Sequence, residues 1–345
     1  MSADTILSIK DLVVEFSTDD GVVHAVDGVT YDVQAGKTLG IVGESGSGKS
    51  VSQLAVLGLI PQPPGRIVSG EAVFDGRDLL KLSRKQLQKI RGGPVAMVFQ
   101  DPMTSLNPVL KIGYQLAEAV KAHNPHVSDG AAEKRAVELL DLVGVPFPER
   151  RVDQYPHEFS GGMRQRAMIA MAIANEPKLL IADEPTTALD VTIQAQILEV
   201  MKAAQEETNA AIVLITHDLG LIAELADTVA VMYAGKVVEM GDVFTVFNAP
   251  RHPYTVGLMR SVPRVELDLD ELQPIPGAPP SLISRPSGCA FHPRCAFSQG
   301  RARCRTDVPE LRPIGQTDHL SRCHFAEELE AQQLSGVAVA GEPES

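Results

Sequence analysis

One stretch, "TLGIVGESGSGKS", constrains the fold of this chain more than any other: an apolar run leads into a glycine-rich loop. The spacing is Gly43-x4-Gly48-Lys49-Ser50, and a helix-like segment, "KSVSQLAVLGLI", follows. Glycines let consecutive backbone N–H groups curl around phosphate oxygens, and the helix points its positive end at them. Lys49 would reach the β- and γ-phosphates and Ser50 would ligate Mg²⁺. We therefore predict a nucleotide-binding loop rather than a plain glycine-rich turn, made by Gly43, Glu44, Ser45, Gly46, Ser47, Gly48, Lys49 and Ser50.

The loop belongs to a chain whose apolar runs alternate with helix-like segments. The runs "TLGIVG", "VAMVFQ", "KLLIADEP", "AIVLITH" and "TVAVMYAG" are short and apolar on both faces, which is typical of central strands. Between them, Ile193, Ile197, Val200 and Met201 follow the spacing of a half-buried helix. This alternation predicts an α/β fold with a mainly parallel sheet.

Other parts of the chain differ in texture. The first 38 residues alternate and carry turn signals, which predicts an antiparallel β subdomain. Helical patterns at 112–122 and 131–143, without buried-strand runs, predict a helical subdomain at about 101–165. Many prolines follow residue 250, so we place the end of the first domain there, an extension at 251–325 and a disordered tail at 326–345.

Two carboxylates follow one of the predicted strands. In "KLLIADEP", Asp183 and Glu184 stand at the carboxyl end of the strand, where open α/β sheets bind ligands. Asp183 is placed to hold Mg²⁺, and Glu184 could polarise a water for attack on the γ-phosphate. The alternative is that Asp183 and Glu184 form a solvated acidic turn. This interpretation is the weaker one because the chain also carries the glycine-rich loop.

Composition excludes some functions. The net charge of −13 argues against a broad nucleic-acid surface and against adsorption to anionic lipid. No run of 18 apolar residues occurs, so we expect no membrane span. The start "MSADTILSIK" lacks a basic region followed by an apolar core, so we expect no secretory signal and a cytoplasmic location.

Four further motifs resemble those of ABC-type ATPases. "FSGGMRQR" resembles their signature, Gln100 in "VFQDP" their Q-loop, "TTALD" their D-loop with Asp190, and His217 in "LITHD" their switch histidine. Taken singly, each has an ordinary alternative: Gln100 a turn residue, His217 a surface histidine, Asp190 a helix cap. Their order and spacing over residues 1–250 favour the family. One departure is Met163, where many members have Gln, and it leaves the Ser–Gly–Gly contacts intact.

The resemblance implies a mechanism. Two ATPase domains would pair head to tail, each ATP lying between one glycine-rich loop and the partner's signature, Ser160-Gly161-Gly162. His217 would contact the γ-phosphate, and Gln100 would link the Mg²⁺ and the water to the helical subdomain. Phe16 is the candidate for stacking on adenine. Both a homodimer and a heterodimer with a paralogous subunit are allowed, because this chain carries every motif.

The segment after residue 250 resembles one branch of the family. "RHPYTVGLMRSVP", "IPGAPPSL" and "GCAFHPRC" are similar to the C-terminal extension of dipeptide/oligopeptide importer ATPases. The resemblance implies two transmembrane permease subunits, an extracytoplasmic solute-binding protein and a peripheral place on the cytoplasmic face of the inner membrane. Related nickel and oligosaccharide importers are alternatives. An ABC ATPase acting on nucleic acid, or a P-loop kinase or GTPase, accounts for fewer of the motifs.

The only cysteines of the chain lie in this extension: Cys289, Cys295, Cys304 and Cys323. A reducing compartment disfavours disulfides. The spacing lacks the C-x2–4-C pairs of structural zinc sites, whereas a [4Fe–4S] cluster needs four thiolates and is freer in spacing. Some members of this branch carry such a cluster on similar cysteines. We therefore expect [4Fe–4S], with Zn²⁺ or free thiols as alternatives. His292 and His324 are adjacent spare ligands, although ordinary polar loop residues are the stronger interpretation of both. Because the cysteines lie far along the chain from every ATP motif, we expect a structural role and no role in hydrolysis.

Overall fold

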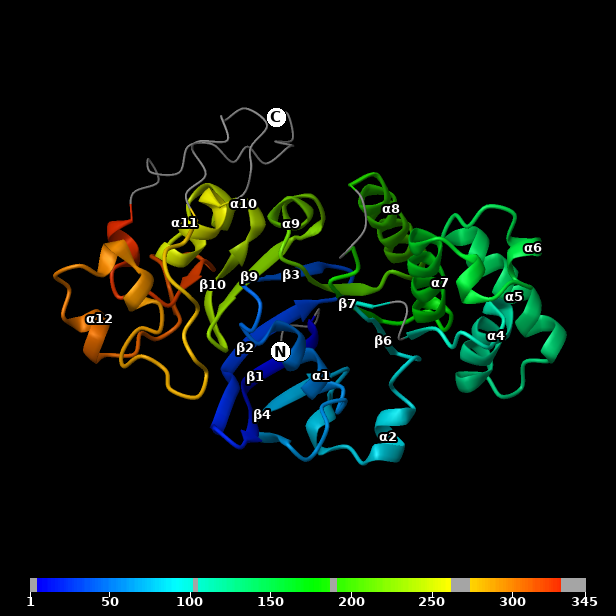
Figure 1. Ribbon diagram of the computed structural model, residues 1–345, viewed down its shortest axis with the longest axis horizontal. Helices are drawn as coiled ribbons and strands as arrows, with labels where there is room; N and C mark the ends of the chain where they lie inside the picture. The colour runs from blue at the N-terminus through cyan, green and yellow to red at the C-terminus, as the bar shows by residue number, and fades with distance from the viewer. Residues whose placement is uncertain (1–4, 102–104, 187–190, 262–273, 330–345) are drawn as a thin grey trace. The chain divides into compact units, whose positions relative to one another are not determined.

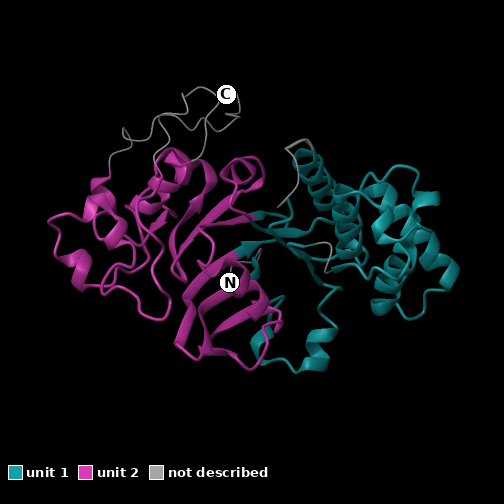
Figure 2. Cartoon of the chain, in the orientation of Figure 1, with its two compact units in different colours: residues 1–7, 33–38, 74–215 teal, residues 8–32, 39–73, 216–345 magenta. Residues whose placement is uncertain are grey.

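The computed structural model describes residues 5–101, 105–186, 191–261 and 274–329 (Figure 1). The chain divides into two compact units (Figure 2): unit 1 comprises residues 1–7, 33–38 and 74–215, and unit 2 comprises residues 8–32, 39–73 and 216–345. Each unit therefore takes in segments that are distant in the sequence.

Unit 1 contains three parallel strands in the order β6 (Val95–Val98), β7 (Leu179–Asp183) and β8 (Ala211–Ile215). Their registers pair Val98 with Ala182 and Asp183 with Ile215. Every residue of β7 and β8 is buried, as expected for strands covered on both faces. These are three of the strands predicted from the apolar runs.

The helices of unit 1 confirm the helical segments read from the sequence. The predicted 112–122 and 131–143 helices are α4 (Ile112–His123) and α5 (Asp129–Leu142), and Ser128 caps α5 by accepting from the Ala131 N–H. In α8 (Val191–Thr208), Ile197, Val200 and Met201 are buried as their spacing predicts, and Ile193 is half-buried. Among the residues that the structure describes, unit 1 also contains α2 (Arg84–Gln88), α6 (Pro148–Arg151) and α7 (Gly161–Ile173).

Unit 2 holds the strand that precedes the glycine-rich loop. β3 (Thr38–Val42) pairs in parallel with β9 (Thr228–Tyr233), and β9 turns into the antiparallel β10 (Lys236–Asp242). Two short strands continue from β10: β12 (Leu320–Ser321) and then β11 (Arg312–Pro313), both antiparallel. The sequence pattern did not predict β10, β11 or β12.

The N-terminal strands form a separate sheet. β1 (Thr5–Thr18) lies between β2 (Gly21–Gln34) and β4 (Gly65–Phe74). Because only Asp19 and Asp20 join β1 to β2, the two strands form a hairpin, as predicted. The helices that the structure describes in unit 2 are α1 (Lys49–Val56), α9 (Leu219–Leu225), α10 (Val243–Asn248), α11 (Pro253–Arg260) and α12 (Arg303–Thr306).

The C-terminal segment has few regular elements and is tied to β10 by a buried carboxylate. Glu239 is fully buried, accepts from the backbone N–H groups of Arg251 and His252, and lies 2.7 Å from the His319 ring. Ala326–Glu328 form a 3₁₀ turn, and Ala326 and Leu329 are buried. The expected disordered tail is therefore wrong for residues 326–329, and its remainder lies outside the described residues.

None of the helices that the structure describes has the length and apolar character needed to cross a membrane.

Candidate nucleotide-binding site

The glycine-rich loop leaves β3 and enters α1 with a backbone that only glycine accommodates at two positions. Gly43 has φ +150°, and a Cβ there would lie 2.2 Å from the Met232 carbonyl oxygen. Gly48 has φ +100°, and its Cβ would lie 2.4 Å from the Ala25 carbonyl oxygen. The loop is therefore pressed against neighbouring backbone at both ends, which fixes where its N–H groups point.

The loop is exposed at Ser45 and Gly46, buried from Ser47 to Lys49 and half-buried at Ser50. Lys49 is buried, and its Nζ donates to the carbonyl oxygens of Gly43 (2.7 Å) and Glu44 (3.1 Å). Ser47 is also buried, and its Oγ has no protein hydrogen-bond partner. A buried hydroxyl without a partner inside a loop of this type is what a phosphate-binding site requires.

The loop also contacts the C-terminal segment, through Glu44. The Glu44 N–H donates to the Tyr254 hydroxyl at 2.8 Å, and its carboxylate accepts from both terminal nitrogens of Arg294 at 2.6 and 2.9 Å. The Glu44 carboxylate is the main reason why the pKa of Arg294 is raised. The extension that bears the cysteines is far along the chain from every ATP motif, yet it contacts the glycine-rich loop through Arg294 and Tyr254. Sequence reasoning missed Tyr254 and Arg294, since no spacing rule connects them with Glu44.

The two carboxylates predicted after β7 differ in setting. Asp183 is buried at the end of β7, whereas Glu184 is half-buried with φ +48°, in the left-handed region. The Glu184 N–H donates to the Ile215 carbonyl at 2.8 Å, and its carboxylate accepts from Gln100 Nε2 at 3.0 Å. The structure thus brings together two of the predicted catalytic side chains. Non-glycine residues in the left-handed region are uncommon, and such strain is often found at functional sites.

The signature segment begins α7. Ser160 is the N-cap residue, and its Oγ accepts from the Met163 N–H at 3.3 Å. Ser160 and Gly161 are exposed, whereas Gly162 is buried so closely against Ile193 that a Cβ would lie 2.7 Å from Ile193 Cγ2. Because Met163 contributes its backbone N–H to the cap, the departure from Gln at this position leaves the cap intact.

Three predicted residues remain. His217 is exposed just after β8, and the next residue, Asp218, caps α9. Phe16 is half-buried near the end of β1, where its ring packs on Gly65. Asp190 lies outside the described residues.

The four cysteines of the C-terminal segment line one small cavity, together with the rings of Phe291, Phe297 and Phe325. Burial raises the pKa of all four thiols, to about 11 for Cys295 and to about 12 for Cys323. The sulfurs of Cys289, Cys295 and Cys323 each accept from the backbone N–H two residues further on. Within the described ranges, no three His, Cys, Asp or Glu side chains are arranged to hold a single metal ion.

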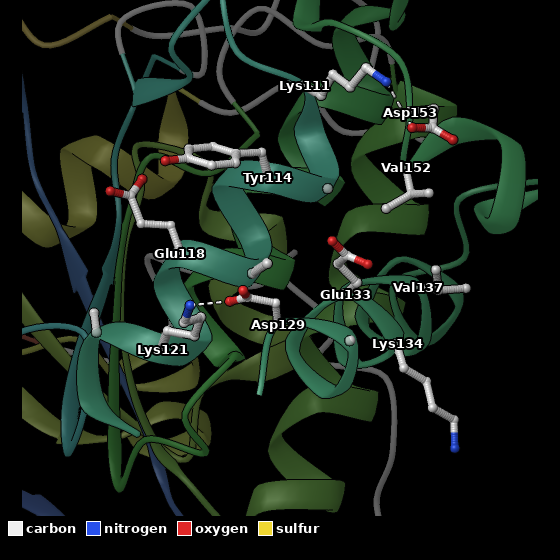
Figure 3. Close-up of a pocket in the computed structure, with 14 residues that line it drawn as sticks. Lys111, Tyr114, Glu118, Lys121, Asp129, Glu133, Lys134, Val137, Val152 and Asp153 are labelled. Atoms are coloured by element: carbon white, nitrogen blue, oxygen red, sulfur yellow. Dashed lines mark hydrogen bonds and ion pairs between the residues drawn. The ribbon is translucent and has the colours of Figure 1, made fainter. Parts of the chain in front are cut away.

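A second concave surface lies on unit 1, between α4 and α5 (Figure 3). It is an open groove of about 1090 Å³. Among its lining residues, Tyr114 and Glu118 belong to α4, and Glu133 belongs to α5. Ion pairs between Lys121 and Asp129 and between Lys111 and Asp153 brace it. The Tyr114 side chain is 58% exposed, so the groove offers an aromatic surface to solvent.

Comparison with known proteins assigns the chain. A family model described as "ABC transporter" matches residues 26–187, and one described as "Oligopeptide/dipeptide transporter, C-terminal region" matches residues 238–304. The oligopeptide transport ATP-binding protein OppD of Bacillus subtilis is 57% identical over 294 residues, which cover 85% of this chain and 82% of OppD. The chain belongs to the ABC transporter ATP-binding family.

Two further relatives define its place in the family. The dipeptide transport ATP-binding protein DppD of Escherichia coli is 50% identical to this ABC subunit over 320 residues, covering 93% of this chain and 96% of DppD. Among solved structures, the dimeric ATP-binding cassette MJ0796, in a post-hydrolysis state with ADP and Pi, superposes with a TM-score of 0.62 at 27% identity. It covers 69% of this chain and 98% of that one. The fold is therefore the ABC ATPase P-loop fold.

Proposed function

We infer that this chain is the ATP-hydrolysing subunit that powers import of di- and oligopeptides through separate transmembrane subunits of an ABC transporter. The observation that carries this conclusion is the joint match of an ABC transporter model and an oligopeptide/dipeptide transporter C-terminal model to one chain. The names of the OppD and DppD relatives support the same assignment. ATP is the substrate that this family binds.

We propose that the glycine-rich loop holds the triphosphate. The inward-facing Lys49 and the unpartnered Ser47 hydroxyl support this role. Ser50, Gln100 and Asp183 would hold Mg²⁺, whose charge would offset that of the phosphates. Hydroxyl, amide and carboxylate oxygens are the hard donors that Mg²⁺ prefers, so this donor set fits the ion.

We propose Glu184 as the group that polarises the attacking water. The hydrogen bond that Gln100 donates to Glu184 supports this role, because the amide orients the carboxylate and links it to the helical subdomain. His217 would hold the γ-phosphate and the geometry of the water. These roles need no covalent intermediate, since phosphoryl transfer depends chiefly on positioning and electrostatics.

We propose that a second ATPase subunit completes the site. Ser160 and Gly161 are exposed at the first turn of α7, where backbone N–H groups favour an anion. The dimeric state of the MJ0796 cassette supports such a pairing. The second subunit would be a paralogue or another copy of this chain. Phe16 would stack on adenine, and Asp190 would act in the D-loop.

We propose that the transporter contains two permease subunits and an extracytoplasmic solute-binding protein, with this chain at the cytoplasmic face of the inner membrane. The helical subdomain at 101–165 would contact the permeases, and the exposed Tyr114 supports a protein-binding surface there. The proposed domains are 1–250 for the ATPase and 251–325 for the extension.

We propose that the four cysteines bind a [4Fe–4S] cluster. The support is that all four thiols line one cavity with apolar rings, and that backbone N–H groups point at three of the sulfurs. A single Zn²⁺ would need sulfurs about 3.8 Å apart, from Zn–S bonds of about 2.3 Å. The arrangement of the described side chains disfavours a single ion of this kind. When bound, the cluster would supply four metal–thiolate bonds that organise a segment with little regular structure.

The cluster is tested by anaerobic purification followed by absorbance spectroscopy and by iron, sulfide and zinc analysis. We expect about four irons per chain and a broad absorbance near 400 nm that Cys295→Ser removes. Colourless protein with one zinc per chain would replace the cluster by zinc, and metal-free protein with four titratable thiols would remove the metal altogether.

The transport function is tested by reconstituting this chain in proteoliposomes with permease and solute-binding subunits of a peptide importer from the same organism. We expect di- or oligopeptides to stimulate ATP hydrolysis, and Glu184→Gln to abolish the stimulation. Stimulation by nickel or by oligosaccharides instead would assign the related importers. Stimulation of ATP hydrolysis by DNA without membrane components would overturn the transport function. The net charge of −13 already disfavours binding to DNA.

A further inference from the structure

We propose that Arg294 and Tyr254, both in the segment after residue 250, are positioning residues that fix the glycine-rich loop through Glu44. The inference rests on the proposed function, since it concerns how the loop is held for ATP. It gives the C-terminal segment a direct part in nucleotide binding. The residues concerned all lie within unit 2.

Arg294 is held in place by four hydrogen bonds to three residues. Its terminal nitrogens form the two bonds to the Glu44 carboxylate, Nε donates to the Pro276 carbonyl at 2.9 Å, and one terminal nitrogen also donates to the Tyr233 hydroxyl at 3.3 Å. The Arg294 side chain is 5% exposed and that of Glu44 is 25% exposed. Because this buried ion pair has two parallel hydrogen bonds, it fixes the orientation of the Glu44 carboxylate as well as its distance from Arg294.

Tyr254 holds the backbone of Glu44, whereas Arg294 holds its side chain. Its side chain is fully buried, and its hydroxyl accepts the Glu44 N–H. Burial raises the pKa of Tyr254, so the hydroxyl stays neutral. Because the Glu44 N–H is committed to Tyr254, the plane of the Gly43–Glu44 peptide is set, and with it the direction of the N–H groups that follow in the loop.

The pair also has an electrostatic consequence. Glu44 stands between Gly43 and Ser45 in a loop that must accept a highly negative triphosphate. Arg294 neutralises the Glu44 carboxylate, so the loop presents no unpaired negative charge. Without Arg294, the carboxylate would repel ATP and would be free to draw the loop out of place.

The contact runs on to the cysteine cavity. Phe291 lines that cavity and packs edge-on against Tyr233 (centroids 5.2 Å apart) and Tyr254 (5.4 Å apart). Arg294 immediately precedes Cys295 in the chain. The segment that bears the cysteines therefore also supports the glycine-rich loop. If this segment unfolds, the packing that holds Arg294 and Tyr254 against Glu44 is lost.

The test measures ATP affinity and steady-state hydrolysis for the full-length chain in the reconstituted transporter. We expect Arg294→Met to raise the Kd and KM for ATP by roughly 10- to 100-fold, as for loss of a charge-assisted pair, with kcat changed less than threefold. Arg294→Lys should recover part of the loss. Glu44→Gln placed in Arg294→Met should return the KM to within about threefold of Glu44→Gln alone, because the unpaired charge is gone.

A matched control separates positioning from general damage. Arg312 makes a two-pronged pair with Glu327 in the same segment, away from Glu44, so Arg312→Met should leave the KM unchanged. If Arg294→Met folds poorly, Tyr254→Phe removes only the acceptor of the Glu44 N–H and should still raise the KM severalfold. A purely structural role would lower the melting temperature and the active fraction while leaving the KM and the Glu44→Gln recovery unmoved.

The proposal is overturned if Arg294→Met and Tyr254→Phe both bind ATP within twofold of the unaltered chain. Lys49→Ala distinguishes this failure from failure of the proposed function. If Lys49→Ala loses ATP while Arg294→Met does not, only the positioning role is wrong. If Lys49→Ala retains ATP affinity, the assignment of the nucleotide site itself is wrong.

Discussion

The two glycines Gly43 and Gly46 provide the sharpest test of how the phosphate loop works. At Gly46, with φ +78°, an added Cβ meets nothing within 4 Å, so Gly46→Ala should cost only the left-handed strain of about 1–2 kcal/mol. At Gly43, the Cβ would come within 2.2 Å of the Met232 carbonyl oxygen. An ordinary carbon–oxygen contact is about 1 Å longer, so Gly43→Ala must shift the loop by a comparable distance.

A displacement of about 1 Å at a reacting group can cost on the order of 100-fold. We therefore expect Gly43→Ala to weaken ATP binding by about 100-fold and Gly46→Ala by about 5- to 30-fold. Titration with a fluorescent ATP analogue measures both, and circular dichroism confirms that each variant is folded. If the two variants bound ATP within threefold of each other, contact with the Met232 carbonyl would not be what fixes the loop.

Three further predictions follow from the site. Glu184→Gln should bind ATP within about threefold of the unaltered chain but hydrolyse it at least about 100-fold more slowly, and near-normal single-turnover rates would reassign the base. Burial lowers the pKa of His252 to about 3, so its neutral ring stabilises the fold above pH 6.5 and that stability is lost as pH falls. Between pH 7.5 and 5.0, denaturant unfolding should lose about 2 kcal/mol more in the unaltered chain than in His252→Asn, and equal losses would contradict the shift. Ser160→Arg should abolish hydrolysis in transporters where it faces an intact site, while each subunit still binds ATP; unchanged turnover would refute the shared site.

Most of the central fold could be predicted because its signals are local. The runs that became β3, β7 and β8 are apolar except for Thr38 and Asp183 at strand ends, and every residue of these strands is buried, as the pattern predicts. The helices α4 and α5 begin and end within two residues of their sequence patterns. Gln100 and Glu184 were each predicted as site residues, Gln100 through family resemblance, but the bond between them was not predicted.

The support of the loop could not be predicted in this way. Glu44 and Arg294 are 250 positions apart, and Arg294 lies in a proline-rich stretch without periodicity. The two-residue strands β11 and β12 are likewise too short to leave a pattern, and they form because β10 offers an edge. Long-range pairing of this kind depends on the finished fold and not on neighbouring residues.

The pairing of β12 with β10 has a consequence for how this protein can be handled and how it evolves. An ATPase trimmed after α10 would expose the backbone of β10 as an open template for intermolecular association, and Glu239 would lose the N–H groups of Arg251 and His252 as well as the His319 ring. The terminal segment therefore closes this edge of the sheet, and we expect a chain shortened at this point to self-associate.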